Sequence, residues 1–244
     1  MRLRRLGPDL DVWQVGHELR LGAGIRMPVN ATLVRLADGA TLLYSPVPID
    51  DAIAAEIEAI GPVGSIVAPS RLHHLWAGDA ARRWPAARLH AAPGLRGKRP
   101  DLRIDAELGQ EGAPPEWGDV LDAVVVAGAP RLSEVVMFHR PSGTLLCADL
   151  VFNLTGPASL PTRMLLRLSG TGGGRLAQSR AWRFFARDRA AARALAERIL
   201  RWPIARIAVA HGEPYDAPDA RHALAIAMGR MTRARLALPT TAAA

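Results

Sequence analysis

The chain has 244 residues, 49% of them hydrophobic, so it can bury a substantial core and extended disorder is excluded over most of its length. Its formal net charge is +8, and Lys98 is the only lysine among its 31 basic residues. The single cysteine, Cys147, excludes an intrachain disulfide and a four-cysteine zinc site, and no apolar stretch is long enough for a membrane span.

The arginine content has two interpretations. It can mark a surface for anionic partners, or it can reflect a composition biased toward arginine and alanine. The arginines are spread along the chain and few aromatic residues lie among them, which favours the compositional interpretation over a nucleic-acid surface. We expect a cytoplasmic protein with no membrane partner and no nucleic-acid partner.

The beginning of the chain predicts an antiparallel hairpin. Residues Leu10–Val15 and Ala31–Leu36 are typical of strands, and we interpret Gly22–Asn30 between them as a loop. Asp38-Gly39 is a strong two-residue turn signal that joins the second strand to Thr41–Ser45. Two antiparallel strands are therefore expected to open the domain.

A strand–helix alternation follows. Asp50 or Asp51 can cap a helix at Ala52–Ile60, which ends at Gly61-Pro62. The apolar run Ser65–Ala68 predicts a strand, and two histidines come after it in a short loop. A helix is predicted next at Ala77–Trp84, followed by a short strand that places His90 on a sheet face rather than in a site.

The second half of the chain predicts a second hairpin and then helices. Predicted strands are 121–126, 134–139, 144–148 and 204–210, and predicted helices are 179–201 and 217–235. Residues 155–179 lack a long periodic pattern, and we interpret Gly170–Gly174 as a mobile lid or linker because the phosphate-loop lysine is missing. We expect one domain over residues 1–238 and a disordered tail at 239–244.

Side chains that bind metals follow three of the predicted strands. His73 and His74 follow the strand that ends at Ala68, while Asp149 and His211 each directly follow an apolar strand. An acidic side chain at the end of a buried strand is costly unless it is paired or binds a metal. Since strand ends can meet at one edge of a sheet, these residues form a candidate site for zinc, iron or manganese.

The order of these elements and motifs resembles the metallo-β-lactamase-like superfamily, from about Asp11 to about Met231. The family's His-x-His-x-Asp-His loop corresponds here to Arg71–Gly78. With Gly78 as the anchor, His73 takes the place of the second histidine, and the other positions hold arginine, leucine and tryptophan. A shifted frame makes His74 the ligand in place of the aspartate.

Two further motifs of the family are better kept. Leu145–Phe152 is similar to the family's aspartate-bearing strand end and contains Asp149, and Ala210-His211-Gly212 is similar to its closing histidine. Pro130 stands where another histidine is expected, and Glu134 is the nearest residue that can substitute. The resemblance implies an α/β fold, an αββα sandwich of two mixed β-sheets flanked by helices.

Two hypotheses follow from the resemblance. The first is a metal-dependent hydrolase-like protein with at most one divalent metal ion, zinc before iron or manganese, and no two-metal centre. The residues that it implies are metal ligands His73, His74, Asp149 and His211, catalytic residues Asp149 and Glu134, and substrate-binding residues Arg71 and Arg180. Glu134 would be a fourth ligand or a general base, and the arginines would hold an anionic small-molecule substrate.

The second hypothesis is a catalytically inactive, metal-free binding or scaffold module on the same fold. In that case Asp149 would pair with an arginine such as Arg71, and the histidines would be ordinary hydrogen-bonding side chains. The sequence leaves the substrate unnamed and a homodimer open, because a fold does not fix a function.

Overall fold

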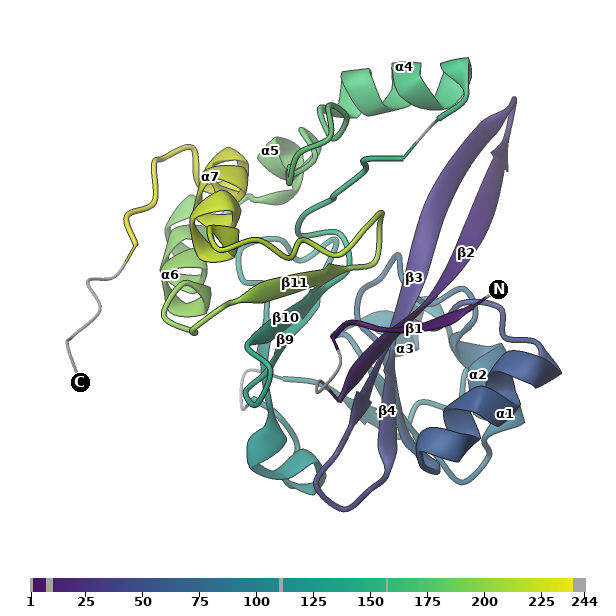
Figure 1. Cartoon of the computed structure of the whole chain (residues 1–244). Helices are drawn as coiled ribbons and strands as arrows, with labels where there is room; N and C mark the ends of the chain where they lie inside the picture. Colours follow the sequence, from purple (N-terminus) through teal and green to yellow (C-terminus); the bar gives the residue numbers. More distant parts are fainter. Residues whose placement is uncertain (1, 8–10, 110–111, 157, 239–244) are drawn as a thin grey trace.

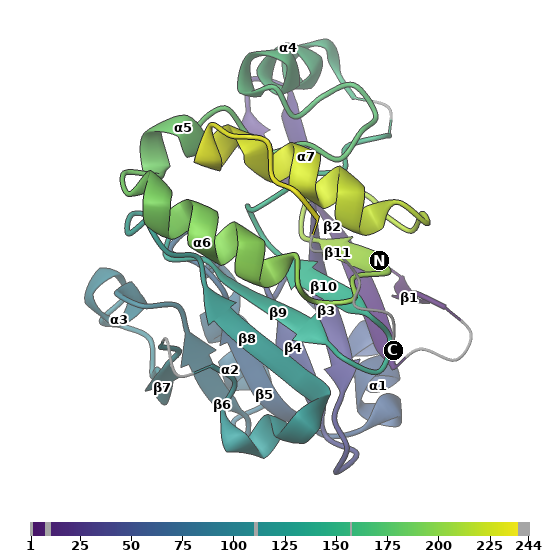
Figure 2. The same cartoon turned by 90° about the vertical axis from the view of Figure 1, so that its left-hand side faces the viewer.

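The computed structural model describes residues 2–7, 11–109, 112–156 and 158–238, and the predicted tail at 239–244 lies outside them. Over the described residues two β-sheets pack face to face, and helices cover both outer faces (Figures 1 and 2). The first sheet has seven strands and the second has four within this part of the chain. The predicted αββα sandwich is confirmed.

The elements have the following bounds. Across the first sheet the order is β1 (Leu3–Arg5), β2 (Val12–Gly22), β3 (Ile25–Arg35), β4 (Thr41–Tyr44), β5 (Val63–Ala68), β6 (Arg88–Ala91) and β7 (Ala106–Glu107). Across the second sheet it is β11 (Arg206–Val209), β10 (Thr144–Cys147), β9 (Val135–His139) and β8 (Leu121–Val125). The helices are α1 (Asp51–Ile60), α2 (Ala77–Arg83), α3 (Leu95–Lys98), the 3₁₀ helix η1 (Pro115–Val120), α4 (Leu160–Ser169), α5 (Trp182–Phe185), α6 (Arg189–Ile199) and α7 (Ala220–Thr232).

The core between the sheets is built from the inward faces of both. Val67 of the first sheet and Met137 and Leu146 of the second belong to one buried cluster. Each such side chain stabilises the fold by roughly 1.5–3 kcal/mol through removal of its apolar surface from water. The hydroxyl of Tyr44 crosses this layer and donates a 2.8 Å hydrogen bond to the carbonyl of Val135.

Two pairs of parallel strands bring together the carboxyl ends of the strands that precede the candidate metal-binding residues. Strand β4 runs parallel to β5 in the first sheet, and β10 runs parallel to β11 in the second. The carboxyl ends within each pair therefore lie side by side. A backbone hydrogen bond of 2.8 Å, from the amide of Asn30 in β3 to the carbonyl of Ala210, ties the two sheets at this edge.

Several local predictions are confirmed. Asp38-Gly39 joins β3 to β4 as an antiparallel pair in which Arg35 lies opposite Thr41. Gly39 has a φ of 85°, which a side chain would strain. Helix α1 begins after Asp50, whose carboxylate accepts a 2.9 Å hydrogen bond from the backbone of Ile53.

The predicted loop at Gly22–Asn30 is wrong. Strands β2 and β3 continue through this region as a long hairpin arm that projects from the sandwich (Figure 1). They turn at Ala23 and Gly24, whose φ angles of 48° and 73° suit a two-residue hairpin turn. Ile25, Met27 and Val29 alternate with more exposed residues, as in a strand, but Gly22, Gly24 and Pro28 in the same segment favoured a loop.

The helices of the second half also differ from the prediction. Helix α4 lies in the segment that showed no long periodic pattern, with Ser159 as its N-cap. The single helix predicted at 179–201 is divided into α5 and α6. It breaks because Asp188 caps α6 by accepting a 3.0 Å hydrogen bond from Ala191, and a capping residue has non-helical dihedral angles.

Candidate metal centre

The loop after β5 positions the first histidine. The Ser70 hydroxyl accepts hydrogen bonds of 3.1 and 3.0 Å from the backbone amides of Leu72 and His73. This serine turn fixes the backbone direction immediately before the histidine pair. Successive residues in a tight turn point in different directions, so the turn also determines that His73 and His74 separate.

The end of β11 positions the second histidine. His211 is followed by Gly212, which has a φ of 99° and whose Cβ, if present, would lie 2.0 Å from the carbonyl oxygen of Asn153. Only glycine fits this close approach. The backbone N–H of Asn153 donates a 3.1 Å hydrogen bond to the backbone carbonyl of His211. This bond holds the segment after Asp149 against the segment after β11.

Three of the predicted residues form one cluster: His73, Asp149 and His211 each offer a ligand atom within 4.8 Å of the other two. The Nε2 atoms of the two histidines are 3.0 Å apart, and Asp149 Oδ1 lies 3.5 Å from Nε2 of His73 and 3.6 Å from Nε2 of His211. Their side chains are only 10–13% exposed. The cluster is therefore almost enclosed and has its three ligand atoms facing one another.

The outer nitrogens of both imidazoles are held by other groups. His73 Nδ1 lies 2.9 Å from the hydroxyl of Ser45, and His211 Nδ1–H donates to the carbonyl of Pro28 at 3.1 Å. These contacts orient both Nε2 atoms toward the cluster, as the outer contacts of metal-binding histidines do. Ser45 follows β4 with a φ of 56°, a strained conformation for a serine that the surrounding structure must hold.

Asp149 is poised as an anion in this site. Burial raises the pKa of its carboxyl group, but His73 and His211 outweigh burial and hold the pKa far below the usual range. Its second oxygen, Oδ2, is buried and has no hydrogen-bond partner among the described residues. A buried carboxylate oxygen without a partner is costly, and a bound cation would satisfy it.

Glu134 lies behind Asp149 and outside the cluster. It is fully buried, and its two carboxylate oxygens accept hydrogen bonds of 2.7 and 3.1 Å from the backbone amides of Ala148 and Asp149. Burial and the charge of Asp149 raise its pKa to about 8, although the backbone donors act in the opposite direction. The structure thus places Glu134 where it anchors the backbone that carries Asp149.

The protonation of His73 depends on the same carboxyl groups. Burial lowers the pKa of its imidazole, but the charges of Asp149 and Glu134 exceed this effect and leave the pKa raised.

Ring packing restricts the second histidine. The ring of Phe152 stacks on His211 with ring centroids 4.9 Å apart and an angle of 11° between the planes. This contact holds the His211 ring in one orientation.

The structure does not bring three other predicted residues to the cluster. His74 Nδ1 lies 3.0 Å from an Arg99 nitrogen, and burial, Lys98 and Arg99 lower the pKa of His74. Arg71 directs a nitrogen to the carbonyl of Pro130 at 3.5 Å. Arg180 hydrogen bonds to backbone carbonyls at the end of α4.

The predicted pairing of Asp149 with Arg71 is wrong. The carboxylate contacts the two histidines instead, because the ends of β10 and β11 lie together while Arg71 turns toward Pro130. Sequence reasoning missed the supporting roles of Ser45 and Pro28. The only available signal was that Ser45 ends a predicted strand, which is not specific.

A small cavity of about 60 Å³ opens beside the cluster. Its lining includes His73, His74, His211 and Ser45, and its other lining residues are apolar. The apolar lining residues are Leu19, Val29, Pro46, Val47, Leu72, Leu75 and Trp76. None of the described residues that line it is a lysine or arginine.

Comparisons with known proteins agree with this architecture. The family model described as "Domain of unknown function (DUF4336)" matches residues 10–166. No curated protein sequence matches the chain.

Solved metallo-β-lactamase structures are similar over nearly the whole chain. One from Hirschia baltica has a TM-score of 0.64 at 12% identity, covering 94% of this chain and 97% of its own. One from Erythrobacter litoralis has a TM-score of 0.63 at 15% identity, covering 93% and 95%. FIM-1 from Pseudomonas aeruginosa, in its mono-zinc form, has a TM-score of 0.62 at 14% identity, covering 95% of this chain and 94% of its own. The fold predicted from the motifs is confirmed, and at these identities the likeness shows the fold alone.

Proposed function

The chain belongs to the DUF4336 family, and on this premise we propose that it is a metal-dependent hydrolase-like protein that binds one divalent metal ion. The proposed ligands are His73, Asp149 and His211. The observation that carries the proposal is that their ligand atoms face one another while both histidine Nδ1 atoms are held from outside. The metal-dependent fold neighbours support it at the level of the fold.

The spacing of the ligand atoms supports a single tetrahedral ion. Zinc bonds of about 2.0–2.1 Å in a tetrahedron separate neighbouring ligand atoms by roughly 3.3 Å. The three separations here are 3.0, 3.5 and 3.6 Å. Two imidazoles and one carboxylate suit zinc first, and non-haem iron or manganese next, with coordination positions left open. A second metal ion is not proposed, because no other such ligand group occurs among the described residues.

A zinc ion bound there would supply Lewis acidity and lower the pKa of its coordinated water toward neutrality. The protein's own contribution is to hold the ligands. Ser45 and the Pro28 carbonyl orient the two imidazoles, and Glu134 fixes the backbone of Asp149. Asp149 stays ionised and balances positive charge.

The substrate proposal follows from the cavity lining. Because the described lining has several apolar side chains and no lysine or arginine, we propose that an uncharged, largely apolar group lies next to the metal. The anionic substrate expected from Arg71 and Arg180 finds no support in where these side chains lie. A cytoplasmic location remains part of the proposal, and the buried free thiol of Cys147 is compatible with it.

One observation favours the alternative, a metal-free binding or scaffold module. The 3.0 Å separation of the two Nε2 atoms is a hydrogen-bond distance, so the two histidines can satisfy each other without an ion, although Asp149 Oδ2 is then left without a partner. The loss of most of the His-x-His-x-Asp-His motif of the metallo-β-lactamase-like superfamily agrees with this alternative. Metal content distinguishes the two functions directly.

The test is elemental analysis of protein purified without an affinity tag and then dialysed against metal-free buffer. We expect close to one zinc, iron or manganese per chain, lost in His211→Ala and retained in His222→Ala, an exposed histidine on α7. Zinc-dependent ester hydrolysis that disappears in Asp149→Asn would support the hydrolase assignment. Wild-type protein that binds no added zinc would reject the proposal in favour of the metal-free module.

A further inference from the structure

The positive charge of the chain is concentrated in two segments. Residues 150–187 and 220–244 contain ten arginines and no aspartate or glutamate. The other residues of the chain carry 21 basic and 23 acidic side chains. The whole net charge of +8 therefore arises from two segments that are distant in sequence.

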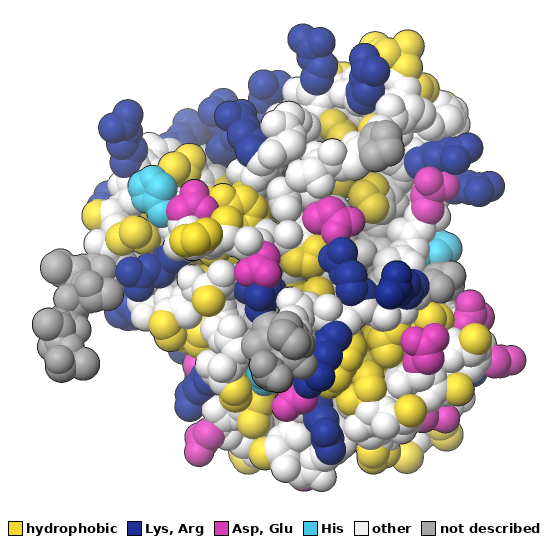
Figure 3. Space-filling view, in the orientation of Figure 1, with side chains coloured by type: hydrophobic (Ala, Val, Ile, Leu, Met, Phe, Trp, Pro, Cys, Tyr) yellow, Lys and Arg dark blue, Asp and Glu magenta, His cyan; other side chains and the backbone are white. Residues whose placement is uncertain are grey.

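The fold joins these segments at one end of the molecule. Arg230 of α7 donates to the carbonyl of Gly170 at 2.8 Å and also to that of Gln178, and the Gln178 side chain accepts a 2.8 Å hydrogen bond from the amide of Met231. Arg180 donates to the carbonyls of Arg167 and Leu168 at the end of α4. Lysine and arginine side chains gather along this end in Figure 3.

We define the basic face as the arginines that this junction brings together. Two lie on α4 itself, three lie in the segment after it and act with α7, and three lie on α7 or directly after it: Arg163, Arg167, Arg175, Arg180, Arg183, Arg230, Arg233 and Arg235. Within the described part of the chain none of them forms an ion pair, whereas twelve other arginines do.

The arginines of the basic face also act on one another. The pKa of Arg230 is lowered, first by burial and then by the charges of Arg180, Arg175 and Arg183. A concentration of like charges without acidic neighbours is unfavourable in isolation. It becomes favourable beside an anionic partner.

An apolar ridge lies beside these arginines. Leu160, Met164 and Leu168 follow one another at four-residue spacing along α4, so they share one face of the helix. They are 63%, 58% and 72% exposed. On the opposite face Thr162 and Leu166 are buried. The helix is thus fixed to the molecule on one side and presents aliphatic side chains to solvent on the other.

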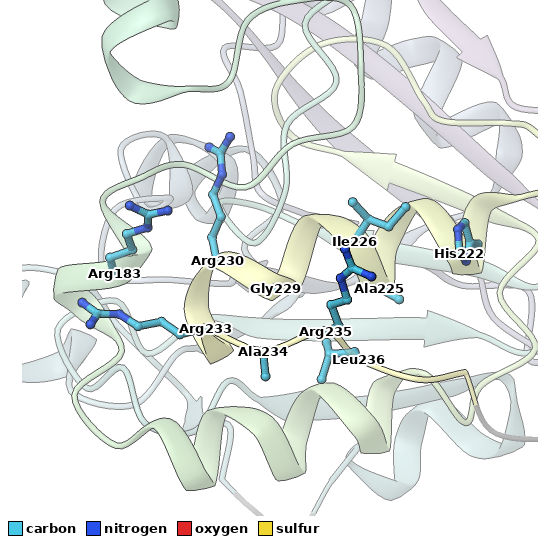
Figure 4. Close-up of a pocket in the computed structure, with 10 residues that line it drawn as sticks. All are labelled: Arg183, His222, Ala225, Ile226, Gly229, Arg230, Arg233, Ala234, Arg235 and Leu236. Atoms are coloured by element: carbon cyan, nitrogen blue, oxygen red, sulfur yellow. The ribbon is translucent and has the colours of Figure 1, made fainter.

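The end of α7 adds a hollow of about 1000 Å³ to the basic face. Arg183 reaches it from α5, while Arg230, Arg233 and Arg235 reach it from α7 and the residues that follow (Figure 4). The exposed side chain of Ile226 lies at its edge. Several guanidinium groups around one concave, partly apolar hollow suit a phosphate-bearing headgroup.

We propose that the basic face and the apolar ridge of α4 together dock on the surface of a bilayer that contains anionic phospholipids. Arginines attract the headgroups, and Leu160, Met164 and Leu168 enter the boundary with the acyl chains. No helix in the described part of the chain could cross a membrane. Docking on a membrane surface needs no such helix. The sequence-based expectation of no membrane partner rested on the lack of a membrane-spanning stretch, so it does not bear on surface docking.

The chemistry of the face distinguishes this partner from two others. Nucleic-acid surfaces combine arginines with several aromatic side chains that stack on bases, but the ridge is aliphatic, and Phe184 of α5 is the one aromatic residue among the large exposed hydrophobic side chains of the described chain. A second copy of the chain would bring two arginine-rich faces into repulsion. Aliphatic side chains bordered by arginines that form no ion pair match an anionic lipid interface.

The experiment is co-sedimentation of the full chain with vesicles of phosphatidylcholine alone or mixed with phosphatidylglycerol. We expect binding at least about tenfold stronger to the mixed vesicles, and weaker binding as salt is added. The double variant Arg163→Gln/Arg167→Gln should lose about tenfold in affinity. The matched pair Arg35→Gln/Arg96→Gln removes the same charge at exposed sites elsewhere and should bind like the wild type.

A second variant tests the apolar part. Leu160→Ser/Leu168→Ser should also lose about tenfold in affinity for the mixed vesicles, with unchanged thermal stability because both side chains are exposed. Equal binding to both vesicle types, or equal losses in the two arginine pairs, would overturn the proposal. If the protein bound a DNA duplex more tightly than the vesicles, the partner would be a nucleic acid and the proposal would be overturned. If the wild-type protein formed a dimer that the two leucine changes abolished, the partner would be a second copy of the chain, with the same consequence. Metal content is measured in the same preparations, so a change in vesicle binding can be separated from a change in the metal centre.

Discussion

The Nε2 atoms of His73 and His211 lie 3.0 Å apart although 138 positions separate the two residues in the chain. Their rings meet edge to face, with centroids 4.9 Å apart at 75°. One ring comes from the loop after β5 in the first sheet and the other from the end of β11 in the second. The candidate site therefore exists only where the two sheets of the sandwich meet.

The two adjacent histidines should differ in their effect on metal binding. His73→Ala removes a ligand atom of the cluster and should lower zinc affinity by 100-fold or more, on the order of the loss of one coordinate bond. His74→Ala should leave affinity within a few fold, because His74 contacts Arg99 rather than the cluster. Competition with a zinc-binding dye measures both. The reverse order of effects would assign the ligand to His74.

The hydroxyl of Ser45 should matter to metal affinity through His73. Both Ser45→Ala and Ser45→Gly remove the group 2.9 Å from His73 Nδ1, so each should weaken zinc binding by about tenfold. Glycine relieves the strain that serine and alanine both carry at a φ of 56°, so the glycine variant should be thermally more stable than the alanine variant. Equal stability with unequal affinity in the two variants would contradict this account.

Glu134→Gln should damage the protein although it conserves size. Both oxygens of Glu134 accept backbone N–H groups, so an amide must turn one N–H toward another N–H in a buried place. We expect a loss of about 1–3 kcal/mol in the free energy of unfolding, and about tenfold in zinc affinity because Asp149 loses its backbone anchor. Urea unfolding and dye competition measure these separately. A variant with wild-type stability would show that the buried carboxylate has no such structural role.

His139 should make the protein sensitive to mild acid. Burial lowers its pKa to about 4, with Asp11 opposing weakly, whereas an unfolded histidine titrates near 6.5. The unfolded chain then binds more protons between these values, so stability falls as the pH drops from about 6.5 toward 4, by up to about 3 kcal/mol.

The variant His139→Gln should lose this part of the pH dependence, and His222→Gln serves as a control for changing an exposed histidine. Urea unfolding at pH 7.5 and pH 5 gives the comparison. If wild type and His139→Gln lost the same stability between these pH values, the burial of an uncharged His139 would be refuted.

Local signals in the sequence determined the strands that carry the cluster. The Asp38-Gly39 turn, the Asp50 cap of α1 and the apolar runs before Asp149 and His211 were all predicted and are observed. Each depends on the conformational preference of a few neighbouring residues or on the burial of one short segment. The spacing of motifs along these strands was also enough to identify the fold.

Two other elements were predicted wrongly or missed because their local signals conflict. In the hairpin arm of β2 and β3, the alternation of Ile25, Met27 and Val29 stands beside glycines and a proline that favour a loop, and the strand pairing decides the outcome. Helix α4 turns its regularly spaced aliphatic residues outward, against the usual relation of periodicity and burial. In both cases the packing partner lies elsewhere in the chain.

Only the tertiary structure decided which side chains meet. The sequence left His73 and His74 open as ligands, and the Ser70 turn directs the first to Asp149 and the second to Arg99. The sequence also shows two segments rich in arginine and free of acidic residues, but only the packing of α7 against the segment after α4 brings them together. The pattern of residues along the sequence specifies which strands and helices form. The direction in which a side chain points depends on turns and on contacts that form only when the sheets pack.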